Sequence, residues 1–492
     1  MSSNPSFAGN PKISAVLPEH RGLYYGGTWH EPHGGYAETF NPATGDSLGR
    51  CAQANAEDVH NAALEAHSAF REWRKTGPIE RGDALRKIAH AIRVNAEELG
   101  LIDSADCGNP VSEAVADVHA AAKQVEYFAG LATEIKGETS MIGDRIVNAT
   151  LREPFGVCAR LIAYNHPLLF AAKFAPALVA GNTVILKPAV QSPLSAYRLM
   201  ELIDGILPPG VLSVLTGGIE CGQALVSHEL VPKITLIGGA ATGRAILAGG
   251  ASRMKQIDME LGGKNAMIIF PDADLKQAVN GAVRGMNFTW CGQSCGSTSR
   301  LFIHESIWDQ VVAGVIEGAK HYVPGIPTEK VTTMGSLVSK AHWDRVMNYI
   351  DIGKEEGATL RTGGQPPSDP KLSKGCFIEP TIFTDVTMNM RIAKEEIFGP
   401  VLSVFKWKDE DEMFEMVNGV EYGLTSAIFT ASISNAYKAA RRVEAGFVWV
   451  NNASAHFMGV PFGGVKQSGN AREESLSEVQ SFTYVKNVSF NL

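Results

Sequence analysis

The sequence lacks the features that mark several classes of protein. Its most apolar stretch, residues 161–180, is interrupted by Asn, His, Lys and two Pro residues, which argues against a membrane span. It has no basic cluster, and 44 basic residues against 52 acidic ones give a formal charge of -8, which argues against a nucleic-acid partner. The opening residues, MSSNP, show neither the basic nor the apolar part of a secretory signal. We therefore predict a cytoplasmic protein with no membrane partner.

Cysteine is sparse and follows no pairing pattern. The seven cysteines lie without clustered spacing at positions 51, 107, 158, 221, 291, 295 and 376. A small disulfide-stapled protein would have an even, clustered set, so this distribution favours reduced thiols and a reducing compartment. Cys291 and Cys295 stand four residues apart, but no His or Cys lies at a usual metal-ligand spacing from them. We predict no metal site.

What the sequence does contain is an alternation of short β-rich segments with longer helical ones. With 492 residues, 45% hydrophobic and 20% charged, the chain has the composition of a globular protein of two or three domains. The alternation predicts an α/β fold with a doubly wound parallel sheet. The expected strands are residues 157–163, 183–187, 211–215 and 234–237, and the expected helices are residues 167–180, 193–207 and 242–252.

A second alternating series follows residue 265 and predicts a second α/β unit. Its expected elements are strands at 266–270 and 300–303 and helices at 275–288 and 306–322. Residues 56–101 have amphipathic helical patterning and are expected to pack on the first sheet. The Pro-rich residues 363–374 predict a surface loop, and residues 481–490 alternate as a half-exposed strand does, which by itself fits the edge of its own sheet.

Four motifs occur in a fixed order. Residues 287–295, NFTWCGQSC, place a thiol in a Gly-rich turn after a helical segment; MELGGKN precedes it at 259–265, and EEIFGP and PFGG follow at 395–400 and 461–464. Each motif alone has an ordinary structural interpretation, since an intracellular cysteine is most often a small buried hydrophobe. Together they resemble the aldehyde dehydrogenase superfamily, in its NAD(P)-dependent hydrolytic form, over nearly the whole chain from NPATG at 41–45.

The resemblance implies a domain organisation. A Rossmann-like cofactor domain would comprise residues 1–136 and 156–262, a second α/β catalytic domain residues 263–460, and a small β oligomerisation element residues 137–155 and 475–492. Residues 461–474 would return to the cofactor domain. In the family the terminal strand joins the β-ribbon before the first βαβ strand, so the resemblance favours a homodimer or a homotetramer over an isolated edge strand.

The predicted cofactor site lies at the carboxyl edge of the first sheet, where ligands bind in open α/β folds. Lys187 closes a predicted strand, and Gly238, Gly239 and Gly243 follow another and open a helix, where a pyrophosphate can approach backbone N–H groups. The resemblance implies that Lys187 binds the adenosine ribose and that Glu396 and Phe398 hold the nicotinamide side. The expected cofactor-binding residues are Ala163, Tyr164, Asn165, Lys187, Gly238, Gly239, Gly243, Leu261, Glu396 and Phe398.

Two departures from the family pattern bear on the cofactor. Gly239 stands where a Ser or Thr is usual, which removes a side-chain contact to phosphate. Val190 stands where many NAD-selective members have a glutamate that bonds the ribose 2′-hydroxyl. A carboxylate would repel a 2′-phosphate and valine would not, so the expected cofactor is NAD or NADP.

The resemblance also assigns the chemistry. Cys295 would attack the aldehyde as a thiolate, which requires help because a free thiol has a pKa of about 8.5. The Asn165 amide and the Cys295 backbone N–H would bind the oxyanion, and Glu260 would activate water to hydrolyse the thioester. Lys173 and Glu473 match residues proposed to relay protons. Asn165 and Lys173 are one residue closer here than in many members, and Ala163-Tyr164 replaces the common Pro-Trp.

The resemblance identifies the reaction better than it identifies the substrate. The expected pocket residues are His166, Leu169, Phe170, Trp290, Ser294, His456, Phe457 and Phe462. This mixture of aromatic and polar groups suits a medium-sized or aromatic aldehyde, and no arginine pair stands out to bind an ω-carboxylate. Two alternatives stay open: a CoA-acylating relative, which would typically lack a glutamate at the Glu260 position, and a non-catalytic protein on the same scaffold.

Overall fold

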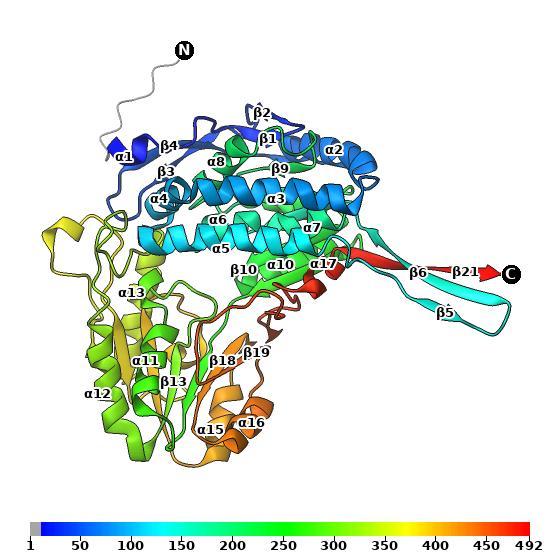
Figure 1. The fold of residues 1–492 in the computed structure, drawn as a ribbon. Helices are drawn as coiled ribbons and strands as arrows, with labels where there is room; N and C mark the ends of the chain where they lie inside the picture. The colour runs from blue at the N-terminus through cyan, green and yellow to red at the C-terminus, as the bar shows by residue number, and fades with distance from the viewer. Residues whose placement is uncertain (1–10) are drawn as a thin grey trace.

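Two seven-stranded sheets, each covered by helices, form the body of the protein (Figure 1). The computed structural model describes residues 11–492, so the opening residues that bear on a secretory signal lie outside the described part. Among residues 11–492 no helix combines the length and apolarity needed to cross a membrane. The seven cysteines are all free, and no group of three metal-ligating side chains occurs among the described residues.

The first sheet has the strand order β11-β10-β7-β8-β9-β1-β2, and its five strands from β11 to β9 are parallel. This is the doubly wound sheet expected from the sequence. Its strands are β1 (Leu23–Tyr25), β2 (Thr28–His30), β7 (Val157–Leu161), β8 (Thr183–Lys187), β9 (Leu212–Val214), β10 (Lys233–Gly238) and β11 (Gln256–Leu261). The strand interiors are buried, as parallel strands under helices require.

Helices cover both faces of this sheet. They are α2 (Ala56–Trp73), α3 (Pro78–Val94), α4 (Ala96–Cys107), α5 (Val111–Gly130), α6 (Pro167–Ala171), α7 (Ala175–Val179), α8 (Leu194–Leu202), α9 (Ile219–Ser227) and α10 (Ala240–Ala251). The single helix expected at 167–180 is instead α6, a 3₁₀ turn at Ala172–Phe174, and α7. Pro176 gives the reason, because it has no N–H to donate and sterically opposes a continuous helix through the preceding turn.

The second sheet has the order β14-β15-β16-β13-β12-β18-β19, with only the edge strand β14 antiparallel. Its strands are β12 (Ala266–Ile269), β13 (Arg300–His304), β14 (Thr359–Thr362), β15 (Thr381–Thr384), β16 (Val401–Trp407), β18 (Thr425–Phe429) and β19 (Phe447–Val450). Its helices are α11 (Leu275–Gly285), α12 (Trp308–Ala319), α13 (Lys340–Glu355), α14 (Arg391–Lys394), α15 (Glu410–Asn418) and α16 (Ile433–Arg442). Residues 363–374 form the expected loop, apart from a 3₁₀ turn at Pro370–Leu372.

The helix expected at 275–288 ends three residues early. Asp274 caps its start by accepting from the Gln277 N–H, and α11 ends at Gly285. Asn287 then takes a left-handed conformation with a φ of 56°, which starts the 3₁₀ turn Phe288–Trp290. The turn directs the chain into the cysteine-containing loop.

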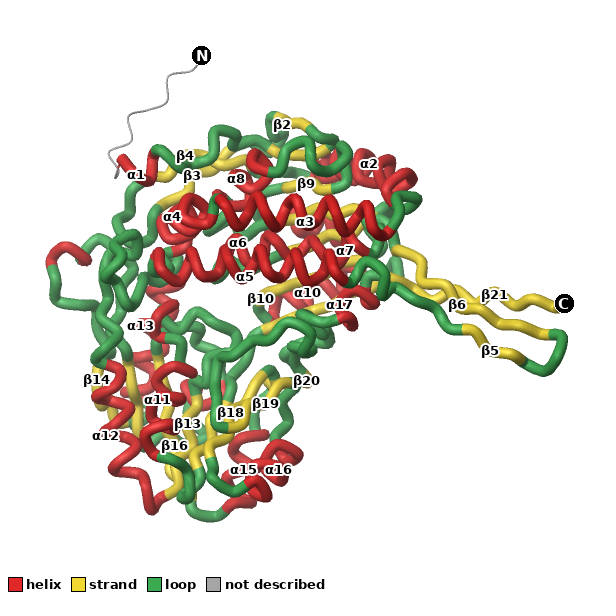
Figure 2. Tube along the Cα trace, viewed as in Figure 1, coloured by secondary structure: helices red, strands yellow, loops and turns green. Residues whose placement is uncertain are grey.

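A three-stranded arm projects from the body (Figures 1 and 2). It contains β5 (Thr139–Met141), β6 (Ile146–Pro154) and β21 (Thr483–Asn491), and β21 pairs antiparallel with β6 along its whole length. The predicted pairing of the terminal strand with this ribbon is therefore confirmed. The remaining elements are short: α1 (Pro11–Ser14), β3 (Tyr36–Phe40), β4 (Ser47–Ala52), a 3₁₀ turn at Glu305–Ile307, β17 (Tyr422–Gly423), β20 (Val465–Lys466) and α17 (Leu476–Ser481).

Candidate active site

The cysteine loop lies directly against the loop that carries the EEIFGP motif. Gly292 has a φ of 69°, and a Cβ added there would lie 2.2 Å from the Gly399 carbonyl oxygen. Only glycine permits this approach of two backbones. Cys295, at the end of the loop, is partly exposed, whereas Cys291 is fully buried. Of the two thiols, Cys295 is therefore the one that a substrate can reach.

Asn265 holds the backbone at the thiol. Its amide Nδ2 donates to the Cys295 carbonyl at 2.6 Å and to the Ser297 carbonyl at 2.9 Å, and its Oδ1 accepts from the Thr425 N–H at 3.0 Å. The sequence placed Asn265 inside a motif, but no pattern showed that its side chain would reach a loop thirty residues away in the chain.

Asn165 reaches the same loop from the first sheet. Its Nδ2 donates to the Gln293 carbonyl at 3.0 Å, and the side chain is 2% exposed. The predicted oxyanion donor and the predicted nucleophile thus come from the turn before α6 and from the loop after α11, and the fold brings them together.

Glu260 lies near the end of β11, facing the PFGG motif. A Cβ added at Gly463 would lie 2.7 Å from Glu260 Oε1, so glycine leaves the room that this carboxylate occupies. Both carboxylate oxygens are buried without a hydrogen-bond partner among the described residues. Burial, followed by the negative charge of Glu473, raises the pKa of Glu260 well above its usual range.

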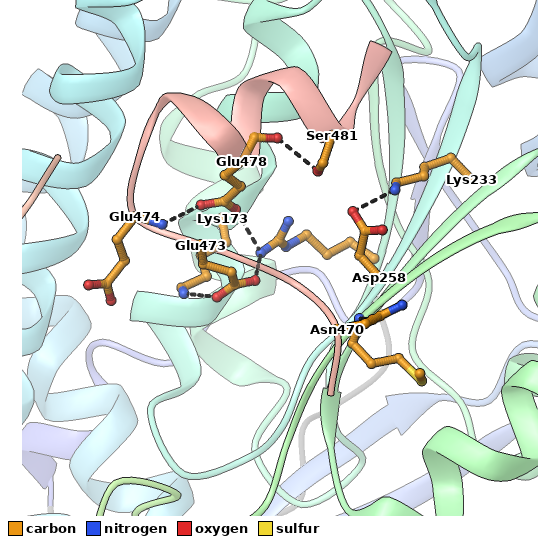
Figure 3. Close-up of polar contacts among 10 residues, drawn as sticks. Lys173, Lys233, Asp258, Asn470, Glu473, Glu474, Glu478 and Ser481 are labelled. Atoms are coloured by element: carbon orange, nitrogen blue, oxygen red, sulfur yellow. Dashed lines mark hydrogen bonds and ion pairs between the residues drawn. The ribbon is translucent and has the colours of Figure 1, made fainter. Parts of the chain in front are cut away.

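A buried ion cluster, whose members Lys173, Glu473 and Glu478 are labelled in Figure 3, lies near enough to Glu260 to shift its pKa. Glu473 pairs with Lys173 through one carboxylate oxygen and with Arg160 through the other, at 2.7 Å, and Glu478 pairs with the same Arg160 at 3.3 Å. Burial acts to raise the pKa of Glu473, but Lys173 and Arg160 outweigh it and lower the pKa. Burial and the charge of Glu473 raise the pKa of Glu478 to about 7. The predicted pair of Lys173 and Glu473 is in direct contact.

The surroundings of Cys295 disfavour ionisation of its thiol. Burial, and after it the charges of Glu260 and Glu396, raise its pKa to about 12. Lys173 opposes this shift without reversing it. A reaction that begins with the thiolate therefore needs either a proton acceptor or a cation brought close to the sulfur.

The carboxyl edge of the first sheet has open space at the start of α10. Gly239 caps α10 with no side-chain bond, and a Cβ added there would meet nothing within 4 Å. A cavity of about 670 Å³ adjoins this helix, lined in part by Gly243, Leu261 and Arg244. The open, glycine-lined helix N-terminus and the adjoining space fit a bound pyrophosphate.

The remaining expected cofactor residues surround the junction of the two sheets. Glu396 accepts from the Gly263 N–H at 2.9 Å, and Phe398 meets Tyr164 edge to face at 5.9 Å. Lys187 ends β8, where burial lowers its pKa. Glu396 therefore lies beside the Glu260 motif, while Ala163 and Tyr164 lie in the turn that leads to Asn165.

The expected pocket residues form two groups. His166 contacts Phe170 and Trp290, with ring centroids 5.5 and 5.0 Å away, and its Nδ1 bonds Asp117 Oδ2 at 2.7 Å. His456 lies 4.6 Å from Phe462 and bonds Glu474 at 3.1 Å. Leu169 and Ser294 are partly buried, and Phe457 is exposed. Sequence reasoning missed Asp117, which lies on α5 far from every motif.

A doubly wound sheet with an open helix N-terminus at its carboxyl edge is an architecture that can bind a dinucleotide. Residues 29–488 match the model of the aldehyde dehydrogenase family. The chain belongs to this family, and its activity is the NAD(P)-dependent oxidation of an aldehyde.

Individual relatives agree with this assignment. The chain is 49% identical to the aldehyde dehydrogenase tropH of Talaromyces stipitatus over 491 residues, which are 98% of this chain and 95% of the relative. It is 40% identical to a betaine aldehyde dehydrogenase of Brucella anthropi over 450 residues, covering 91% and 92% of the two chains. An NAD+ complex of an aldehyde dehydrogenase from Bacillus cereus superposes with a TM-score of 0.95 at 38% identity, covering 99% of this chain and 100% of that one.

Proposed function

We propose that the chain oxidises an aromatic or medium-sized aldehyde to its carboxylic acid through a thioester on Cys295. The observation that carries the proposal is the convergence of Cys295, Asn165 and Glu260 from three separate segments on one site. Cys295 is the nucleophile, Asn165 and the Cys295 N–H are the oxyanion donors, and Glu260 is the base for hydrolysis.

The first half of the reaction makes the covalent bond. The Cys295 sulfur attacks the carbonyl carbon as its proton passes to a base, and the negative charge develops on the substrate oxygen. The Asn165 Nδ2 carries two hydrogens, and the Gln293 carbonyl takes one of them, which leaves the other for that oxygen. The thiohemiacetal carbon then loses its hydrogen as hydride while its C–O bond becomes a carbonyl again, which gives the thioester. A dinucleotide held at α10 and Glu396 would supply the hydride acceptor.

The second half releases the acid. The unpartnered Glu260 carboxylate accepts a proton from water, and the resulting hydroxide attacks the thioester carbon and displaces the Cys295 thiolate. Lys173 and Glu473, in contact behind Glu260, form the path by which that proton leaves. The presence of Glu260 favours hydrolysis over transfer of the acyl group to CoA, and CoA-dependent turnover would reverse this choice.

The substrate proposal is supported by the aromatic rings of Phe170 and Trp290, which contact His166, the residue after Asn165. Because aromatic pairs add roughly 0.5–1.5 kcal/mol per contact beyond area burial, benzaldehyde or phenylacetaldehyde should show a kcat/KM about 2-fold to 12-fold above that of succinic semialdehyde for each ring contact. A panel of these aldehydes, run with NAD and with NADP while reduced nicotinamide is monitored, measures the preference. A higher kcat/KM for succinic semialdehyde would contradict it.

We further propose that the site accepts both NAD and NADP, because Val190 is 41% exposed and bears no charge. In Val190→Glu, repulsion of the 2′-phosphate should raise the KM for NADP about tenfold, an effect on the order of 1.4 kcal/mol, with a smaller change for NAD. Initial rates with both cofactors measure this effect. Val190→Gln, of the same length without the charge, is the control, and an unchanged KM for NADP in the glutamate variant would show that position 190 does not contact the ribose.

We also propose three domains, of residues 1–136 with 156–262, of residues 263–460, and of residues 137–155 with 475–492. Residues 461–474 would return to the first domain, whose residues 1–10 lie outside the described part. The arm supports a homodimer or homotetramer, because Met141, Val485 and Leu492 on it are 62%, 56% and 68% exposed. The seven free cysteines support a reducing, cytoplasmic compartment.

A further inference from the structure

The turn that carries Asn165 is held by the end of α4. Cys107 Sγ donates to the Tyr164 carbonyl at 3.2 Å, and the Asn109 amide Nδ2 donates to the Asn165 carbonyl at 2.8 Å. The Asp103 carboxylate accepts from the Leu168 N–H at 3.0 Å. Three side chains within one short segment therefore fix the backbone on both sides of Asn165.

Asn109 is itself firmly placed. It is 1% exposed, and it follows Gly108, which ends α4 with a φ of 92°. A Cβ added at Gly108 would lie 2.3 Å from Ser336 Oγ, and the Gly108 carbonyl accepts from the Ser336 N–H at 2.9 Å. The backbone that carries the Asn109 amide is thus packed against a segment of the second α/β unit.

Gln293 accepts a hydrogen bond from the Asn165 side chain, whereas Asn109 bonds the Asn165 backbone. Its side chain is fully buried, and its Nε2 donates to the Ser336 and Trp290 carbonyls, each at 3.2 Å, while its Oε1 accepts from the Val338 N–H at 3.0 Å. Its backbone carbonyl accepts the Asn165 Nδ2 hydrogen bond. Ser336 therefore bonds both Gln293 in the cysteine loop and Gly108 at the end of α4.

These contacts close a ring of hydrogen bonds from Asn109 through Asn165, Gln293 and Ser336 back to Gly108. We propose that Asn109 is a positioning residue for the oxidation: it fixes the Asn165 backbone so that the second amide hydrogen of Asn165 points at the substrate oxygen. The inference rests on the proposed role of Asn165 as an oxyanion donor. Asn109 does not touch the reacting atoms and acts through Asn165.

The physical reason is preorganisation. A donor that is already aimed at the developing charge needs no reorganisation as the reaction proceeds, and loss of one such donor costs on the order of 10²–10³ in rate. Without the hydrogen bond from Asn109, the Asn165 amide is still present, but its orientation toward the substrate oxygen is less restricted. Asn109→Ala should therefore lose less than Asn165→Ala, about 10-fold to 30-fold in the rate of acyl-enzyme formation.

The test measures the rate of the first turnover, as the burst of reduced nicotinamide after rapid mixing, in Asn109→Ala, Asn165→Ala and the double variant. If Asn109 acts through Asn165, Asn109→Ala slows the burst in the parent and has no further effect in the Asn165→Ala background. The KM for the dinucleotide should change little, while the Tm should fall, as expected for the loss of a buried hydrogen-bonding side chain. Equal slowing by Asn109→Ala in both backgrounds, or a parental burst rate in Asn109→Ala, would overturn the inference.

Asn109→Asp provides a second variant of the same shape if the alanine variant does not fold, because it replaces the donor by an oxygen facing the Asn165 carbonyl and should slow the burst at least as much. Asn182→Ala is the matched control: Asn182 is fully buried and donates to the Ala177 and Phe482 carbonyls away from the site. It should lower the Tm and leave the burst rate unchanged. A parental burst rate in Asn165→Ala would contradict the proposed oxyanion role of Asn165. Additive effects of the two substitutions would contradict only the positioning role of Asn109.

Discussion

Replacing Cys295 with alanine abolishes aldehyde oxidation, with turnover expected to fall by at least about 10⁴-fold, because no covalent intermediate can form. Steady-state assays with NAD and with NADP measure the loss. Cys295→Ser should regain little, since a hydroxyl is a far weaker nucleophile at neutral pH.

The matched control is Cys291→Ala, which removes the fully buried thiol four residues earlier in the same loop. Alanine leaves a small cavity there, so the Tm should fall while turnover stays near that of the parent. Turnover by Cys295→Ala at more than a few per cent of the parental rate would mean that another group attacks the aldehyde.

Replacing Glu260 with glutamine separates the two halves of the reaction. The variant should release about one equivalent of reduced nicotinamide per active site in a burst and then stall, because the thioester forms and no base activates water. Rapid mixing measures the burst, and mass spectrometry of the quenched protein should show the acyl group on Cys295. Steady turnover at the parental rate would show that Glu260 is not the base.

The pH dependence of the parent enzyme provides a second test of the same assignment. The pKa of Glu260 is raised, so its carboxylate fraction, and with it the rate of acyl-enzyme hydrolysis, should increase with pH through that pKa. The Glu260→Gln variant should lose this increase. Asp258→Asn makes the same chemical change two residues earlier on β11, where Asp258 pairs with Lys233 at 2.5 Å outside the site (Figure 3), and it should keep the increase.

The sequence predicted the α/β class and the first parallel sheet from local patterns, and the resemblance to the family implied the pair Lys173 and Glu473, which are in contact. The sequence did not predict the break at Ala172–Phe174 or the early end of α11, where single residues, Pro176 and Asn287, outweigh the helical composition around them. Local propensity describes a window of residues, whereas a helix ends at one position.

The hydrogen bonds that hold the site in place could not be predicted from the sequence, for a different reason. Asn265 to Cys295, Asn109 to Asn165 and Asn165 to Gln293 are bonds between a side chain and a distant backbone carbonyl. A backbone carbonyl carries no residue identity, so nothing in the sequence identifies the acceptor. Such contacts become visible only in the folded chain, and the bond from Asn165 to Gln293 also requires the two α/β units to lie side by side.

The short helix α17 joins the arm to the ion cluster. Glu478, on this helix, bonds Arg160 and the Glu474 N–H, and β21 begins only two residues after the helix ends at Ser481. The arm is thus separated by only a few residues from Glu478 and the ion cluster next to the proposed hydrolytic base, Glu260. An affinity tag fused after Leu492 would extend from the arm in Figure 1. A tag placed before α1, at the other side of the body, would leave the arm and α17 unchanged.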